Sequence, residues 1–239
     1  MGYHDDAFAA FRRGETDLVE QLSRRELARA RASSDVATEV EALCMLARVA
    51  VRDGDVPEAE RLGRVARALA RSTGERRLER APTHILAGCA RISGNLAFAR
   101  TLYQESISLN ETFGEWRMVV VELHNLAYIE LHAGDVDRAR ELFTTARMRT
   151  VAQDIDDMLP YVALDTAVMA AVDGDHQRAT RLLAALDNTL RAAGQILDPD
   201  DSIEQTTLRE ELVTTLGRKS FEALYATGAS LGLRDALDV

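Results

Sequence analysis

The sequence predicts an all-α fold in which antiparallel helix pairs stack into a solenoid. The first observation behind this prediction is a glycine that recurs every 40 residues, at Gly14, Gly54, Gly94, Gly134 and Gly174. The second is the spacing of apolar residues around Gly134, where Leu123, Leu126 and Ala127 precede the glycine. Ala139, Leu142, Phe143 and Ala146 follow it at i, i+3, i+4 and i+7, as on one face of a helix. A single helix pair cannot bury its own apolar stripe, so neighbouring pairs must share it.

Two columns of turn residues divide each repeat into two helices. The recurring glycine can adopt the positive φ that ends a first helix. Asp or Asn follows it in four of the five blocks, and these residues are good caps for a second helix. A second column is expected to end the second helix, and it consists of Ser34, Gly74, Gly114, Asp154 and Gly194.

The period covers residues 1–195, in blocks that start near residues 1, 41, 81, 121 and 161. We expect about five repeats there, followed at residues 196–239 by an acidic linker and a C-terminal helical cap. Pro199 marks the linker, and Phe221, Leu224 and Tyr225 share one helical face in the cap. Residues 195–239 hold four basic and nine acidic residues. Two alternatives stay open for this tail, folding back into a groove of its own chain or docking on another copy.

The composition excludes several classes of function. The chain has 239 residues and a net charge of −10, which disfavours direct contact with nucleic acid because an acidic surface repels phosphate. Cys44 and Cys89 are the only cysteines, too few for a disulfide scaffold, which indicates a reducing compartment. The N-terminus does not have the pattern of a signal peptide, and no apolar run is long enough to span a membrane. We therefore expect a cytoplasmic protein with no membrane contact.

Two stretches resemble a catalytic and a metal-binding motif, and both fail on their context. The stretch GASLG at residues 228–232 fits G-x-S-x-G, but a nucleophile elbow needs a strand before the serine and a histidine after it, and the last histidine is His176. The stretch DPDDSIEQTTLR starts like a calcium loop, but Ile203 occupies the glycine position and Arg209 the glutamate position. We expect no enzymatic activity and no cofactor.

The repeat resembles a known family. A small residue, a Gly-Asp pair, an alanine, an aromatic residue and a second small residue, at these offsets, resemble the tetratricopeptide repeat (TPR), although TPR units have about 34 residues. The resemblance implies a right-handed α-solenoid. At the C-terminal end, the order Leu216-Gly217, Phe221, Tyr225 and Gly228 resembles the end of large actinobacterial LuxR-family regulators with an ATPase core, which implies a sensor or interaction arm of a transcription regulator.

The TPR resemblance places several first-helix columns on a concave groove. One column contains His4, Cys44, His84 and His124. Arginines beside it offer bidentate donors to a carboxylate, and Tyr128 and the histidines add hydrogen bonds. The predicted partner-binding residues are Arg48, Arg52, His84, Arg91, His124, Asn125, Tyr128 and His132. Because helical metal ligands are usually three or four residues apart, we expect no metal at the histidine column.

Three functions compete for this groove. The preferred hypothesis is a non-enzymatic interaction module that binds a protein or peptide partner in bacterial signalling or transcription regulation. The alternative is an effector-sensing domain that binds a small molecule or signal peptide for a LuxR-type regulator. An enzyme built on the histidine column is the third. Wet groove residues without any ligand would explain the same pattern, and a homodimer stays among the candidate partners.

Overall fold

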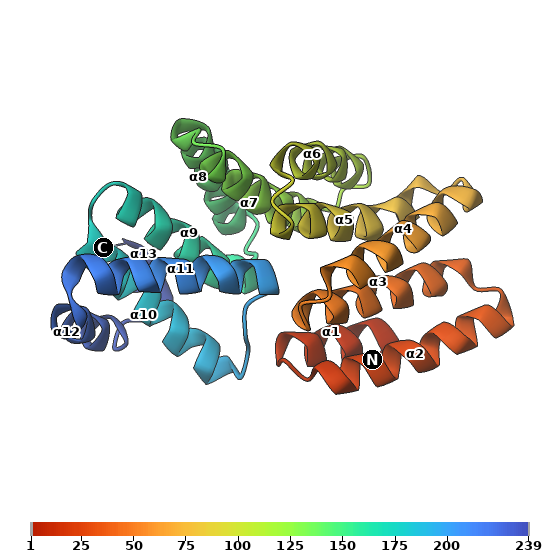
Figure 1. Ribbon diagram of the computed structural model, residues 1–239, viewed down its shortest axis with the longest axis horizontal. Helices are drawn as coiled ribbons and strands as arrows, with labels where there is room; N and C mark the ends of the chain where they lie inside the picture. Colours follow the sequence, from red (N-terminus) through yellow and green to blue (C-terminus); the bar gives the residue numbers. More distant parts are fainter. Residues whose placement is uncertain (1, 239) are drawn as a thin grey trace. The chain divides into compact units, whose positions relative to one another are not determined.

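The computed structural model describes residues 2–238, and within that range it contains α-helices, two short 3-10 helices and no strand (Figure 1). The all-α fold class predicted from the sequence is confirmed. Two compact units divide the chain between Gly134 and Asp135. This division falls inside the repeat region that the sequence predicts for residues 1–195.

The first unit contains seven α-helices among its described residues. They are α1 (Tyr3–Arg12), α2 (Thr16–Ser33), α3 (Val36–Arg52), α4 (Val56–Thr73), α5 (Arg80–Ile92), α6 (Leu96–Thr112) and α7 (Trp116–His132), with the 3-10 helix η1 (Arg76–Glu79) before α5. Each α-helix packs against the next one along the chain, from α1 on α2 to α6 on α7 (Figure 1). The odd-numbered members are the first helices of the predicted repeats.

The second unit contains the remaining helices of the described chain. They are α8 (Val136–Ala152), the 3-10 helix η2 (Asp156–Met158), α9 (Leu159–Val172), α10 (His176–Ala193), α11 (Pro199–Leu216), α12 (Arg218–Gly228) and α13 (Leu233–Asp238). The helices α9, α11, α12 and α13 all pack against α10. None of the helices in residues 2–238 combines the length and the apolar character that a membrane crossing requires.

The turn columns adopt the conformations that the sequence predicts. The first glycine column has φ between 75° at Gly14 and 86° at Gly134. In the second column even Ser34 and Asp154 take positive φ, at 56° and 52°, which shows that the helix end requires this conformation whichever residue stands there. The side chains that follow Gly54, Gly94, Gly134 and Gly174 each accept a hydrogen bond from a backbone N–H of the next helix, so they are the predicted caps.

Small residues let the helices of the first unit approach one another. The alanine columns are fully buried, as at Ala47, Ala59 and Ala66. Gly63 in α4 is the extreme case, because a Cβ built on it would lie 3.1 Å from a methyl carbon of Leu86 in α5. A larger residue there would force the two helices apart or displace the leucine.

The second unit corrects the predicted linker. Pro199 begins α11, so only residues 194–198 connect α10 to the next helix, and the acidic stretch after them is helical. A proline suits the first turn of a helix, where its missing N–H has no intrahelical partner to lose. One carboxylate then fastens the C-terminal helices, because Asp187 of α10 accepts hydrogen bonds from Gln205 and Arg209 of α11 and from Tyr225 of α12.

The stretch GASLG ends a helix, as its context predicts. Gly228 is the last residue of α12, and a Cβ on it would lie 2.6 Å from the Cα of Arg181 in α10. The glycine is therefore required by the close approach of α12 to α10. The hydroxyl of Ser230 donates to the carbonyl oxygen of Thr227 within the same turn.

Candidate binding site

All eight predicted binding residues lie on first helices of the first unit. Arg48 and Arg52 belong to α3, His84 and Arg91 to α5, and the other four to α7. Their burial differs in a way that the repeat columns do not reveal. Arg48, Arg52 and His84 are partly exposed and His132 is exposed, whereas Arg91, His124, Asn125 and Tyr128 are buried.

We call these eight residues the polar strip. At its N-terminal end, two arginines of α3 lie over aromatic rings of α1. The guanidinium carbon of Arg48 is 5.8 Å from the ring centre of Phe8 and 5.9 Å from that of Phe11. The guanidinium carbon of Arg52 is 4.0 Å from the ring centre of Phe11. These distances are those of cation–π contacts. We call Phe8, Phe11, Arg48 and Arg52 the arginine–phenylalanine cluster.

His4 borders this cluster and joins α1 to α3. Its ring stacks on Phe8, with 5.9 Å between the ring centres and an interplanar angle of 8°, and its Nδ1 pairs with the carboxylate of Glu41. The hydrogen bond to Glu41 raises the pKa of His4 above its ordinary value of 6.5, while partial burial and the charge of Arg48 oppose the rise. The imidazolium form of His4 is therefore favoured beside Arg48.

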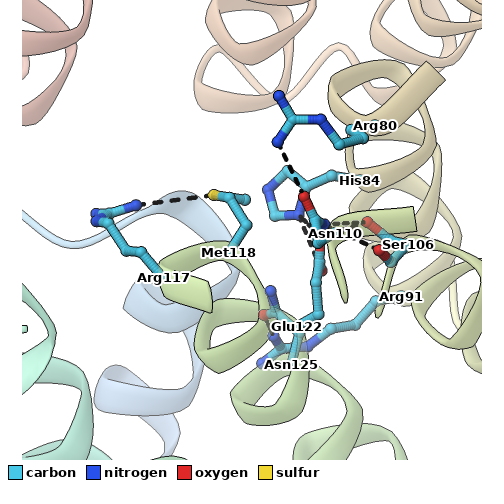
Figure 2. A network of polar contacts seen from close by, with 9 residues as sticks. All are labelled: Arg80, His84, Arg91, Ser106, Asn110, Arg117, Met118, Glu122 and Asn125. Atoms are coloured by element: carbon cyan, nitrogen blue, oxygen red, sulfur yellow. Dashed lines mark hydrogen bonds and ion pairs between the residues drawn. The ribbon is translucent and has the colours of Figure 1, made fainter. Parts of the chain in front are cut away.

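A second polar network lies between α5, α6 and α7, and Figure 2 shows it around Glu122. The side chain of Glu122 is fully buried. Both of its carboxylate oxygens are 3.1 Å from Nδ1 of His84, and Oε1 also accepts a 2.6 Å hydrogen bond from the hydroxyl of Ser106. A buried carboxylate is costly without such partners, so this network ties the three helices together.

The network continues from Ser106 towards the ends of the helices. Asn110 donates to the carbonyl oxygen of Ser106 at 2.9 Å, and its own side-chain oxygen accepts from Arg80 at 3.2 Å (Figure 2). Arg80 and Arg77 both pair with Glu115, at 3.3 Å and 2.6 Å. These contacts join α5 and η1 to α6 and to the residue that precedes α7.

Arg91 forms the buried part of the strip with two residues of α7. Its Nη1 donates to the side-chain oxygen of Asn125 at 2.9 Å, as Figure 2 shows, and its guanidinium carbon lies 4.6 Å from the ring centre of Tyr128. His124 meets the Tyr128 ring edge-on at 5.2 Å between ring centres, and the ring centre of His132 is 6.3 Å from that of Tyr128. The contacts of Arg91 connect α5 to α7 inside the protein, whereas the two histidine contacts of Tyr128 lie within α7.

The histidine column does not act as one group. His4 and His84 have separate glutamate partners on different helices, and burial raises the pKa of the Cys44 thiol to about 12. A thiol with such a pKa stays protonated at neutral pH, which is the wrong form for a metal ligand or a nucleophile. Within residues 2–238 no three His, Cys, Asp or Glu side chains are grouped as a metal site would require.

Sequence analysis missed four residues that the structure brings into the strip, and the repeat contained a signal for two of them. Phe8 stands in the same repeat column as Arg48 and Tyr128, and Phe11 in the same column as Arg91. Comparing every member of those columns would have found both phenylalanines. The other two are Glu41 and Glu122, whose importance comes from their histidine partners on the neighbouring helix.

An open depression of about 510 Å³ in the second unit is a weaker candidate. Asp173, Asp175, His176 and Leu216 are among the residues that line it. Its carboxylates already have structural partners, because Asp173 pairs with Arg140 and Asp175 caps α10. The turn between α9 and α10 and the start of α10 form most of its lining, so its shape follows from the turn and not from a ligand site.

Comparison with known proteins identifies the fold. No protein-family model and no curated protein sequence matches the chain, but solved structures resemble it. A Rap protein in complex with competence and sporulation factor is 16% identical, with a TM-score of 0.69 over 99% of this chain and 66% of that chain. BtubC (BKLC) from P. vanneervenii is 20% identical, with a TM-score of 0.61 over 93% of this chain and 92% of that chain.

A third solved structure belongs to the same structural class. It is a putative kinesin light chain from P. anserina with nearly identical TPR-like repeats, 20% identical, with a TM-score of 0.54 over 80% of this chain and 94% of that chain. The three likenesses establish a TPR-like helical-repeat fold for this chain. Identities this low concern the fold alone, so the resemblance to LuxR-family regulators stays a prediction.

Proposed function

We propose that this chain is a non-enzymatic interaction module that binds a protein or peptide partner along the first helices α1, α3, α5 and α7. The observation that carries the proposal is the polar strip on these helices. Polar side chains of neighbouring first helices contact one another directly, as His84 contacts Glu122 and Arg91 contacts Asn125. Contacts of this kind hold the strip in one arrangement, and a preorganised surface loses less entropy when a partner binds.

The fold supports the proposal in a general way. Repeat proteins of this type use the surface formed by successive repeats for binding, and the Rap structure contains competence and sporulation factor. The proposed context, bacterial signalling or transcription regulation, is based on the LuxR-like order of residues at the C-terminal end. A cytoplasmic location follows from the same proposal.

A selection from a random peptide library against the full chain tests the function. Selected peptides would then be added to the chain during hydrogen–deuterium exchange, with scrambled peptides of the same composition as the control. We expect protection from exchange in α3 and α5, which carry the partly exposed residues of the strip, and little change in the second helices α2, α4 and α6.

Two results would contradict the proposal. One is a selection that yields no peptide with higher affinity than its scrambled control. The other is protection concentrated on the second helices, because the partner would then occupy the opposite side of each repeat. Either result is obtained without substituting any residue, so it is independent of whether a variant folds.

A further inference from the structure

In the arginine–phenylalanine cluster, the contacts of Arg48 within the described chain are with aromatic rings and not with an anionic partner. Several arginines of this unit pair with a glutamate of another helix, such as Arg67 with Glu105 and Arg100 with Glu130. Among residues 2–238, no carboxylate lies within ion-pair distance of Arg48, and its contacts are the two phenylalanine rings. Arg48 therefore presents a partly exposed guanidinium without a counter-ion on a chain of net charge −10.

The two rings hold the guanidinium of Arg48 in place without using its donors. A cation–π contact engages the face of the ring and the positive charge of the guanidinium. The N–H donors of a guanidinium lie in its own plane and form a fork that matches a carboxylate. Phe11 is buried and fixed in the core, whereas Phe8 is partly exposed, so an apolar surface accompanies the charge.

We infer that the arginine–phenylalanine cluster is the anion-binding centre of the proposed interaction surface and takes a carboxylate of a peptide partner, whose neighbouring apolar side chain packs on Phe8. The inference rests on the proposed function and assigns its partner a chemistry. It gives Arg91 a different role, because Arg91 is buried with Asn125 and Tyr128 and positions α7 against α5.

The surroundings favour a single carboxylate over a polyanion such as nucleic acid. Glu41 and Asp5 lie close enough to His4 to raise its pKa, and His4 stacks on Phe8. Two carboxylates beside the cluster would repel a string of phosphates. A single carboxylate forms two parallel charge-assisted hydrogen bonds with Arg48, and this gain offsets the repulsion from Glu41 and Asp5.

Binding of labelled short peptides to the full chain tests this inference by fluorescence anisotropy. The labelled probes are a peptide in which glutamate alternates with phenylalanine and its counterpart with glutamine in place of glutamate. An unlabelled single-stranded oligonucleotide is added as a competitor. We expect the glutamate peptide to bind at least about tenfold more tightly than the glutamine peptide, the size of a charge-assisted hydrogen-bond pair, and the oligonucleotide not to compete.

Three variants test whether Arg48 and Phe8 cause the preference for the glutamate peptide. Arg48→Gln should remove the difference between the two peptides, Arg48→Lys should restore part of it because it keeps the charge without the fork, and Phe8→Leu should weaken both peptides. Arg64→Gln is the matched control, since Arg64 is an exposed arginine on α4 that pairs with Glu60, and its affinities should match those of the unaltered chain. Circular dichroism of each variant verifies that it is folded.

The inference is overturned if the two peptides bind equally, if neither binds, if the preference persists in Arg48→Gln, or if the oligonucleotide competes. These failures differ from a failure of the proposed function. The random library can also yield peptides that lack carboxylates and still protect the first helices. Such peptides would support the interaction module and contradict the carboxylate as its ligand. A preference that disappears equally in Arg64→Gln would mean a diffuse charge effect and would also overturn the inference.

Discussion

Two arginine–aromatic contacts of the first unit each join the first helices of neighbouring repeats, and they differ in burial. Arg48 lies over Phe8 and Phe11 between the first two repeats, where it is partly exposed. Arg91 lies over Tyr128 between the third and fourth repeats, where it is buried and donates to Asn125. The same type of contact is therefore partly exposed at one repeat junction and buried between two helices at the other. Burial and hydrogen-bond partners distinguish the two roles, and residue type does not.

The histidine–glutamate pairs repeat this difference. His4 pairs with Glu41 between α1 and α3, and His84 pairs with Glu122 between α5 and α7. The side chains of the first pair are 57% and 36% exposed, and those of the second 13% and 0%. Solvent screens the first pair, whereas the second is inside the protein, so the two should contribute unequally to stability.

The largest expected effect separates the two arginines. Arg91→Ala leaves a cavity and a buried side-chain oxygen of Asn125 without this donor, and we expect it to lower the free energy of unfolding by about 3 kcal/mol. Arg48→Ala removes a partly exposed side chain and should cost less than about 1 kcal/mol. Urea denaturation monitored by circular dichroism measures both, and equal losses would erase the distinction between the two junctions.

A smaller effect should separate the two glutamates. Glu122→Gln removes the charge that His84 faces inside the protein, and we expect a loss of about 1–2 kcal/mol in the free energy of unfolding. Glu41→Gln changes the screened pair and should cost less than about 1 kcal/mol. The urea midpoints of the two variants, compared in the same buffer, give the answer. A greater loss from Glu41→Gln would reverse the assignment of the buried and exposed pairs.

The smallest effect is a pH dependence at His4. Glu41 and Arg48 face this histidine from α3, Asp5 lies beside it on α1, and the nearby Tyr3 donates to Ser23 of α2. Because the folded-state pKa is raised above 6.5, His4 stabilises the fold fully below that value, and the contribution is lost as pH rises through the raised pKa. Its exposure limits the effect to less than about 0.5 kcal/mol.

Comparison of His4→Gln with the unaltered chain isolates this contribution. The urea midpoint of the variant should fall below that of the unaltered chain at mildly acidic pH, and the two should converge at alkaline pH. His84 is present in both proteins, so its contribution cancels in the difference. A difference that stays constant with pH, or that grows on the alkaline side, would show that His4 is not the titrating group.

Sequence reasoning reached most of the fold and only part of the site. The glycine and cap columns predicted the helix ends, since positive φ and a capping side chain depend on residues close together in the chain. The acidic residues around Pro199 predict a solvated linker, whereas Pro199 begins α11 and leaves only a short connection after α10. Proline disrupts the interior of a helix but is tolerated in its first turn, so Pro199 is compatible with both a linker and a helix start. The sequence pattern does not distinguish these two cases.

The sequence by itself determined the 40-residue repeat, the positions of its turns and the set of first-helix columns that carry arginine, histidine and aromatic residues. Only the tertiary structure decided which members of those columns are buried, and that Phe8 and Phe11 lie beneath Arg48 while Asn125 and Tyr128 enclose Arg91. The physical reason is the range of the interactions. Turns and caps are local, whereas a side chain's partners depend on how closely two helices pack, and that spacing changes with every residue between them.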